Sequence, residues 1–352
     1  MDIREEFLTS YERIRDEVLS DLKSEEFQLP DEIFERVRFC VDYNVPHGKL
    51  NRGLTVVEAY RASRGGPPIE ALSETERQDA FLLGWCVEWL QAFFLVADDV
   101  MDGSKTRRGR PCYYLLDNIG LSAVNDSLLL EAHIYRLLRN RFRGRNEDLE
   151  LYTDLMELFL SVTYSTEIGQ MLDLSSSTGS EVRLEDFTEQ NLLRIYRLKT
   201  STYSFFLPVA LGMRLAGVRN AAHYRIAREV LLEMGIYFQA QDDFLDCFGD
   251  PSVTGKVGTD IEERKCTWLI VEAIKCCTSA QKEILRTCYG REDAACVARV
   301  KQLYHELGLP QRFQLYEQKM YEQMQQKLGN LDADFPVDAL NFLLKSIYKR
   351  SK

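Results

Sequence analysis

Two stretches of the chain change from apolar to acidic in the same way. Residues 81–110, FLLGWCVEWLQAFFLVADDVMDGSKTRRGR, are almost wholly apolar up to three aspartates, and a basic loop follows. Read as a helix, one stripe of this segment holds Gln91, Leu95, Asp98 and Asp102, with Asp99 at its edge. Residues 234–246, MGIYFQAQDDFLD, repeat the design and are followed by a Gly-rich loop containing Lys256. The pattern predicts two buried helices that each end in an acidic cluster.

Helical spacing dominates the rest of the chain, and alternating strand-like runs are scarce. The clearest helical patterns lie at residues 126–143, 149–174 and 225–246, and Gly/Pro-rich breakers separate such stretches without a composition shift. We therefore predict an all-α protein, a bundle of about ten or more helices forming a single domain over residues 1–352. Within it, KTSTYSFFLP at 199–208 is β-branched and aromatic and contains a proline, which predicts an irregular helix.

The paired acidic clusters suggest a metal site. Three carboxylates at a partly buried helix end repel one another unless a cation neutralises them. Oxygen-only ligands suit Mg²⁺, which is completed by water and substrate phosphate and acts as a Lewis acid on a leaving diphosphate. A single cluster of this kind also fits a solvated acidic helix end, and the second copy favours the metal. The candidate ligands are Asp98, Asp99, Asp102, Asp242, Asp243 and Asp246.

Composition narrows the possible partners and the compartment. The 352 residues include 44 basic and 55 acidic side chains, a formal charge of -11, which argues against nucleic acid or an anionic membrane as partner. The longest apolar segment is interrupted by polar residues and ends in aspartates, so we expect burial inside the protein and no integral membrane segment. Nine cysteines without a CxxC pair predict free thiols in a reducing compartment. The acidic, periodic N-terminus is unlike a signal or transit peptide, and we expect a cytoplasmic protein.

Several motifs in order carry a family resemblance. LQAFFLVADDVMDGSKTRRGRPC, YSTEIGQMLDL, LKTSTYSFFLPVA, FQAQDDFLDCFGDPSVTGKVGTDI, KCTW and IYKRSK resemble the trans-isoprenyl diphosphate synthase family in its eukaryotic short-chain type. The similarity extends from GKLNRG at Gly48 to Lys352. It implies the isoprenoid synthase fold, with a central cavity, and a homodimer. It also implies a prenyltransferase that joins isopentenyl diphosphate head to tail to dimethylallyl and then geranyl diphosphate, giving farnesyl diphosphate with three Mg²⁺ ions.

The resemblance also assigns roles to residues. It places Lys199, Thr200 and Gln239 against the developing allylic cation, and Phe238 beside the isopentenyl group. Basic residues and one glutamine then bind the two diphosphates, with metal for the allylic one and without metal for the isopentenyl one. They are Arg107, Lys199, Lys256 and Lys265 for the former, and Lys49, Arg52, Gln91, Arg108 and the terminal Arg350 for the latter. The departing pyrophosphate is the implied base, which agrees with four scattered histidines. Each basic residue by itself also fits a solvated charge.

Phe93 and Phe94 bear on product length. Phe94 precedes Asp98 by four residues, about one turn or ~5.4 Å along a helix, so its ring would stop a hydrocarbon tail anchored at the aspartates. This predicts a fifteen-carbon product, although ordinary core packing also explains the two rings. A geranyl or geranylgeranyl diphosphate synthase is the alternative within the class. A non-catalytic partner subunit or lipid-binding scaffold is the alternative outside it.

Three departures from the family pattern border the predicted site. His47 precedes Gly48 where glycine is usual, Ser165 stands where glutamine is common, and Ser201 replaces a usual alanine. Thr166, Gln170 and Asp173 share one helix face, either along the cavity or in a buried polar network. None of the departures removes a charged ligand, so we expect activity to survive them.

Overall fold

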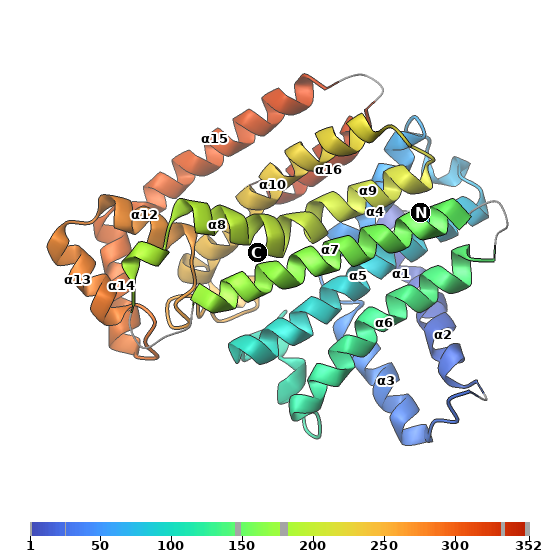
Figure 1. The fold of residues 1–352 in the computed structure, drawn as a ribbon, viewed down its shortest axis with the longest axis horizontal. Helices are drawn as coiled ribbons and strands as arrows, with labels where there is room; N and C mark the ends of the chain where they lie inside the picture. Colours follow the sequence, from blue (N-terminus) through green and yellow to red (C-terminus); the bar gives the residue numbers. More distant parts are fainter. Residues whose placement is uncertain (1, 25, 145–148, 177–181, 332–334, 349–352) are drawn as a thin grey trace. The chain divides into compact units, whose positions relative to one another are not determined.

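The computed structural model describes residues 2–24, 26–144, 149–176, 182–331 and 335–348, and these residues are almost entirely helical (Figure 1). Their backbone contacts divide the chain into two compact units. Unit 1 comprises residues 1–161, 206–227 and 332–343, and unit 2 comprises residues 162–205, 228–331 and 344–352. The prediction of an all-α protein is confirmed, and the prediction of a single domain stays a prediction.

Unit 1 is built mainly on helices from the first half of the chain, with α9 added from the second half. Its helices are α1 (Ile3–Thr9), α2 (Tyr11–Leu22), α3 (Asp31–Asn44), α4 (Asn51–Ser63), α5 (Glu74–Asp102), α6 (Ala123–Phe142) and α9 (Leu207–Leu215), with short 3-10 turns at Ile69–Ala71, Tyr113–Leu115 and Gly120–Ser122. Helix α4 packs against α5 and α9, and α5 also packs against α6. A two-stranded antiparallel ribbon, β1 (Thr106–Arg107) and β2 (Arg110–Pro111), follows α5 and pairs Arg107 with Arg110.

Unit 2 is also helical. Its elements are a 3-10 turn (Leu184–Asp186), α8 (Glu189–Ile195), a π-helix (Tyr196–Phe206), α11 (Pro251–Thr254), α12 (Trp268–Cys276), α13 (Ser279–Cys288), α14 (Ala294–Glu306) and α15 (Leu309–Gly329). Three more helices contribute residues to both units: α7 (Leu149–Ser176), α10 (Ala221–Phe248) and α16 (Val337–Ile347). The core of unit 2 includes Trp268, Phe313 and Tyr304.

Helix α5 is the predicted apolar helix with its acidic end. It begins with a capping box, in which Ser73 and Glu76 satisfy each other's backbone amides, and it ends at Gly103, whose φ of 65° suits the left-handed conformation. By length and composition this helix could cross a membrane, but 78% of its most apolar window is buried within the protein, which is typical of a core helix. The expected burial is therefore confirmed.

The predicted irregular helix is a π-helix. Residues 196–206 widen into π-helical turns, and Pro208, which has no amide N–H to donate, then stands in the first turn of α9. The Ser201 hydroxyl donates a hydrogen bond of 2.9 Å to the carbonyl oxygen of Tyr196 within this segment. Ser201 thus satisfies a carbonyl that an alanine would leave without this donor.

Candidate active site

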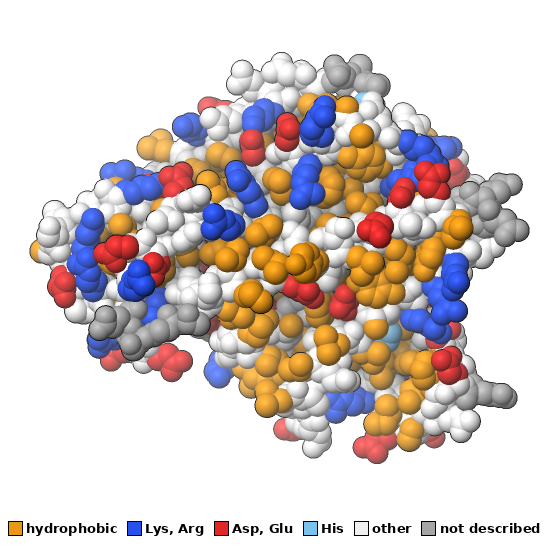
Figure 2. Space-filling model, viewed as in Figure 1, with side chains coloured by type: hydrophobic (Ala, Val, Ile, Leu, Met, Phe, Trp, Pro, Cys, Tyr) orange, Lys and Arg blue, Asp and Glu red, His pale blue; other side chains and the backbone are white. Residues whose placement is uncertain are grey.

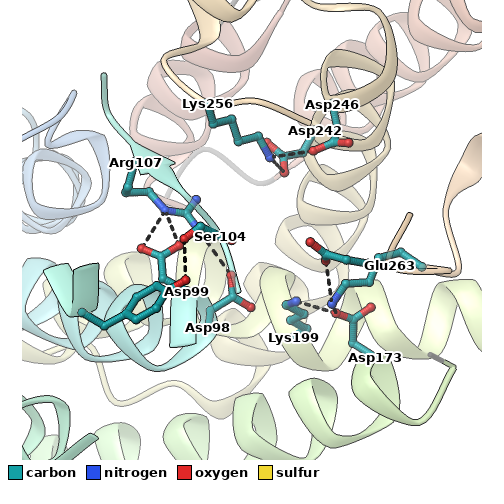
Figure 3. A network of polar contacts seen from close by, with 12 residues as sticks. Asp98, Asp99, Ser104, Arg107, Asp173, Lys199, Asp242, Asp246, Lys256 and Glu263 are labelled. Atoms are coloured by element: carbon teal, nitrogen blue, oxygen red, sulfur yellow. Dashed lines mark hydrogen bonds and ion pairs between the residues drawn. The ribbon is translucent and has the colours of Figure 1, made fainter. Parts of the chain in front are cut away.

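The first aspartate cluster lies at the end of α5, in unit 1. Arg107, from the ribbon that follows, donates to Asp99 at 2.5 Å and to Asp98 at 3.4 Å (Figure 3). Asp99 is buried, whereas Asp98 and Asp102 are partly exposed. Burial alone would lower the pKa of Arg107, but Asp99 and Asp98 raise it above its usual value, so the guanidinium stays charged. The cluster therefore already binds one cationic group, and its first and third aspartates keep access to solvent.

Four of the residues predicted to bind the second diphosphate also lie in unit 1, namely Lys49, Arg52, Gln91 and Arg108. Arg108 donates to the carbonyl oxygen of Asn44 at 3.2 Å, and its backbone φ of 55° is in the left-handed region. With its amide oriented to suit its neighbours, Gln91 accepts a hydrogen bond of 2.8 Å from Arg52. Burial lowers the pKa of Arg108 to about 10. The positive charges of Arg52 and Arg107 also lower it, whereas the negative charge of Glu88 raises it. These groups form a basic cluster at the start of α4.

The second aspartate cluster lies at the end of α10, in unit 2. The Lys256 ammonium lies 3.3 Å from Asp242 and 3.4 Å from Asp246, whose carboxylates are one helical turn apart (Figure 3). The Asp260 amide donates to Asp246 at 3.1 Å, and burial and the neighbouring Asp246 raise the pKa of the Asp260 carboxyl well above its usual value. Asp260 is a fourth carboxylate of this cluster, which the DDxxD spacing of Asp242, Asp243 and Asp246 did not single out.

The middle aspartate of this cluster has a different environment. The Asp243 carboxylate accepts hydrogen bonds from the Tyr196 hydroxyl, from the Trp268 amide at 2.8 Å and from Gln239 at 3.1 Å. Burial raises its pKa to about 7 although these hydrogen bonds lower it. Asp243 is 4% exposed. Its hydrogen bonds connect α10 to the π-helix through Tyr196 and to α12 through Trp268. Metal coordination by Asp243, as by the other five aspartates, stays a prediction.

Lysines of unit 2 converge on a residue that the motifs left open. Lys199 lies 2.6 Å from a carboxylate oxygen of Asp173 (Figure 3), and Lys265 lies 3.0 Å from the same oxygen. Burial would raise the pKa of Asp173, but the two ammonium groups lower it below its usual value. Beside them the Thr200 hydroxyl donates to Gln239 at 2.6 Å. Asp173 thus belongs to a buried ion network, one of the two interpretations that the sequence allowed.

Aromatic side chains complete the predicted set. Phe93 and Phe94 pack with ring centroids 4.8 Å apart on α5, and Phe93 is buried. Phe238 of α10 packs edge to face on Phe205, with ring centroids 5.4 Å apart.

Two further residues singled out in the sequence remain. A ring nitrogen of His47 lies 3.0 Å from the carbonyl oxygen of Asp42. Arg350 lies outside the described residues.

Comparison with known proteins identifies the family. The polyprenyl synthetase family model matches residues 35–307. The chain belongs to the polyprenyl synthetase family. Relatives include farnesyl pyrophosphate synthases of Gallus gallus, 44% identical over 99% of this chain and 93% of the relative, and of Zea mays, 45% identical over 100% and 97%. A solved structure of T. brucei farnesyl diphosphate synthase with risedronate is similar at a TM-score of 0.91, with 31% identity over 99% of this chain and 100% of that one.

Family membership confirms the resemblance found in the sequence motifs. The helical architecture is that of the similar solved structures, and the matched region includes both aspartate motifs. Members of the family generally use Mg²⁺. Among the described residues no three carboxylate, imidazole or thiol groups converge closely enough to enclose an ion by themselves. The oxygen donors of the aspartates suit Mg²⁺ provided that water and substrate oxygens complete its coordination.

Proposed function

We propose that this protein synthesises farnesyl diphosphate by joining isopentenyl diphosphate first to dimethylallyl diphosphate and then to geranyl diphosphate. The observation that carries the proposal is that each DDxxD helix end binds a basic side chain between its carboxylates, Arg107 in one and Lys256 in the other. Carboxylates that already converge on one cation, beside further lysines and arginines, suit a polyanion with its metal ions. Similarity to farnesyl pyrophosphate synthases over nearly the whole chain supports the same activity.

The aspartates would hold three Mg²⁺ ions with the allylic diphosphate. The partly exposed carboxylates Asp98, Asp102 and Asp242 are the best placed to exchange their present contacts for metal, and Asp246 shares its cation with Asp242. When bound, Mg²⁺ stabilises the negative charge that develops on the leaving diphosphate. Asp99 and Asp243, which are buried and hydrogen-bonded, would chiefly hold the two helix ends in place.

Lys199 and Lys265 would contact the same diphosphate. Asp173 holds both ammonium groups at a fixed place, so little side-chain entropy is lost when they bind an anion. Thr200 and Gln239 would present oxygens toward the allylic cation, and their mutual hydrogen bond fixes those oxygens. A site that keeps water from the cation allows the isopentenyl double bond to attack it, and the released pyrophosphate would take the proton.

The isopentenyl diphosphate would bind to the basic cluster of unit 1 without metal. Arg52 and Arg108 provide planar guanidinium groups for bidentate contacts, Lys49 and Gln91 add donors, and Arg350 would contribute from the end of the chain. Phe238 would contact the isopentenyl group, and Phe93 and Phe94 would limit the product to fifteen carbons.

We further propose a cytoplasmic homodimer. Residues Leu121, Val124 and Leu128 follow helical spacing from the 3-10 turn Gly120–Ser122 into the start of α6, and all three are exposed, Leu121 at 77%. Figure 2 shows apolar side chains over this helix. Such a face is typical of protein interfaces, and a second copy would cover it. Size-exclusion chromatography with light scattering, comparing the unaltered protein with Leu128→Glu, tests the dimer. The cytoplasmic location is supported by the free cysteines, five of which are buried, because free thiols suit a reducing compartment.

Product analysis tests the activity. The protein is incubated with dimethylallyl diphosphate and radiolabelled isopentenyl diphosphate, with and without Mg²⁺, and the products are separated by chromatography after removal of the diphosphate. We expect a fifteen-carbon alcohol that depends on Mg²⁺. A ten- or twenty-carbon main product would favour the geranyl or geranylgeranyl alternative, and no turnover under any condition would favour the non-catalytic partner.

A further inference from the structure

Glu88 is a buried carboxylate that belongs to neither aspartate motif. It lies in the middle of α5, 2% exposed, with the fully buried Trp85 and Trp89 as helix neighbours. A carboxylate in such surroundings destabilises the fold unless hydrogen bonds and opposite charges compensate for the lost water. Its partners therefore indicate what it does.

The first partner is the backbone of α4. Helices α4 and α5 cross at Gly53 and Gly84, where a Cβ atom on Gly53 would come 2.9 Å from the Gly84 carbonyl oxygen. This close approach brings the first turn of α4 to the residue one turn after Gly84, which is Glu88. The Gly53 amide accordingly donates to the Glu88 carboxylate at 2.8 Å.

This hydrogen bond replaces a missing helix cap. The first amides of an α-helix have no partner within the helix, and a side chain of the N-cap residue usually accepts from one of them. In α4 the N-cap residue is Leu50, with a φ of 55° and no capping side chain. Glu88 accepts from this turn instead, and its negative charge suits the positive end of the helix. The same turn carries Arg52, and Lys49 precedes it.

The second partner is Gln91, one turn further along α5. In the orientation that satisfies both ends of its amide, the Gln91 nitrogen donates to the second oxygen of Glu88 at 2.9 Å, and the Gln91 oxygen accepts from Arg52 at 2.8 Å. Glu88 thereby decides which way the amide points. Reversing the amide would direct its nitrogen at the Arg52 guanidinium and break the contact.

The charged groups around Glu88 also connect it to the basic cluster. Burial raises the pKa of Glu88, while the Gly53 amide and the positive charges of Arg52, Arg108 and Arg4 lower it. Arg4 in turn donates to the Lys49 carbonyl oxygen at 2.5 Å, which holds the loop before α4. Glu88 therefore offsets the mutual repulsion of three guanidinium groups gathered at one helix start.

We propose that Glu88 is the positioning residue for the isopentenyl diphosphate, because it caps the helix that carries Arg52 and orients Gln91 toward that guanidinium. The inference rests on the proposed function in that it takes the basic cluster of unit 1 as the metal-free diphosphate site. Glu88 itself is too deeply buried to contact the substrate.

The test is Glu88→Gln, which keeps the size of the side chain. One oxygen can still accept from the Gly53 amide, but the new NH₂ group then faces the Gln91 nitrogen, so Gln91 must turn away from Arg52. We expect KM for isopentenyl diphosphate to rise about tenfold or more, since a hydrogen bond to a charged group is lost, and KM for the allylic substrate to stay within about twofold. An unchanged KM for isopentenyl diphosphate in the folded variant would overturn the proposal.

Two further variants separate positioning from general destabilisation. Asp79→Asn removes another buried carboxylate of α5, paired with Arg141 at 2.5 Å, and we expect it to lower Tm without changing either KM. The double variant Glu88→Gln/Gln91→Leu tests whether the two residues act together, because Gln91→Leu removes the amide that Glu88 orients. We expect the double variant to weaken binding of isopentenyl diphosphate by less than the sum of the two single variants, and fully additive weakening would count against the proposal.

Calorimetric titration of isopentenyl diphosphate into each variant provides a readout independent of turnover. If Glu88→Gln does not fold, Glu88→Asp, which keeps the charge but shortens the reach, should show the same selective weakening, and equal weakening of both substrates would refute the proposal. An unaltered protein that binds isopentenyl diphosphate but makes no product would instead refute the proposed function.

Discussion

Gly169 of α7 lies directly against the backbone of Lys199 in the π-helix. A Cβ atom on Gly169 would come 2.6 Å from Lys199 Cα, far inside van der Waals contact, so only glycine fits. On α10, Gly235 lies equally close to the backbone and side chain of Ser201. Within unit 2, α7 and α10 therefore approach the π-helical turns through glycines, which place no side chain of their own in the contact.

We predict that Gly169→Ala lowers turnover roughly a hundredfold, because a shift of about 1 Å in Lys199 and Thr200 would misplace groups that must meet the substrate. The added methyl group should also lower the free energy of unfolding by about 1–3 kcal/mol, as expected of overpacking. Steady-state kinetics and thermal melting measure the two effects.

Gly329→Ala is the matched control for this substitution. Gly329 ends α15, and a Cβ atom there would meet nothing within 4 Å. We expect unchanged turnover and stability equal to or above that of the unaltered protein, since alanine favours a helix. Equal effects of the two substitutions on turnover would contradict the close-packing explanation.

Substitution of Asp242 should chiefly lower turnover, whereas substitution of Asp243 should chiefly lower stability. The Asp242 side chain is 38% exposed, so Asp242→Ala should lower turnover by orders of magnitude while changing Tm little. Asp243→Ala leaves the buried Tyr196 hydroxyl and Trp268 amide without their acceptor, which should destabilise the fold by roughly 2–4 kcal/mol. Kinetics and melting curves of both variants, with Asp98→Ala as the counterpart of Asp242→Ala, provide the comparison. Full turnover in Asp98→Ala or Asp242→Ala would exclude the metal assignment.

Phe94→Ala should lengthen the product while activity is retained. Removing the ring opens space one helical turn from Asp98 on α5, where the growing chain would otherwise stop. Chromatography should show twenty-carbon and longer products. Leu115→Ala, which shortens an exposed side chain outside α5, is the control, and an unchanged fifteen-carbon product in Phe94→Ala would show that this ring does not limit chain length.

His133 predicts a pH dependence of stability. The side chain is 3% exposed in α6, and neither ring nitrogen has a hydrogen-bond partner among the described residues. Burial lowers its pKa to about 4, from 6.5. As pH falls through this window the unfolded chain binds a proton that the native protein does not, so the free energy of unfolding decreases, by about 3 kcal/mol near pH 4.

His133→Leu should abolish this contribution and stabilise the protein near neutral pH, because it also removes two buried polar atoms without partners. Urea denaturation between about pH 7.5 and pH 4 measures the difference. His305→Gln, at an exposed position, is the control. The explanation would be wrong if His133→Leu lost stability with acid as steeply as the unaltered protein.

The sequence predicted those features that depend on neighbours along the chain. Residue spacing was enough to place Asp98 and Asp102 at the end of a buried helix, because α5 continues without a break from its capping box to Gly103. The aromatic, β-branched segment before Pro208 likewise indicated an irregular helix, which is a π-helix in the structure. Resemblance to the family then supplied the roles of Lys199, Lys256 and the basic cluster.

Features that depend on contacts between distant segments could not be predicted in this way. In the sequence alone, the glycines at 53, 84, 169 and 235 look like residues that lower helix stability. Their role in close packing is visible only when the neighbouring chain segment is known. Asp173 gains its importance from two lysines, one of them 92 residues away. Glu88 interrupts an apolar stretch, a signal visible in the sequence, but its partners on α4 appear only in the folded chain. Similarly, nothing in DDxxD distinguishes the buried middle aspartate from the other two.

Because Gln91 and Asp98 lie on the same unbroken helix, the distance between them cannot vary freely. Seven residues correspond to about two turns, or about 10.5 Å along the axis. If the isopentenyl group is held near the first and the allylic group near the second, α5 acts as a rigid spacer between the two reactants. Phe93 and Phe94 lie between Gln91 and Asp98 on this helix, so substitutions there can change the length of the product while the affinity for both diphosphates stays the same. Product length and substrate affinity are thus free to evolve separately.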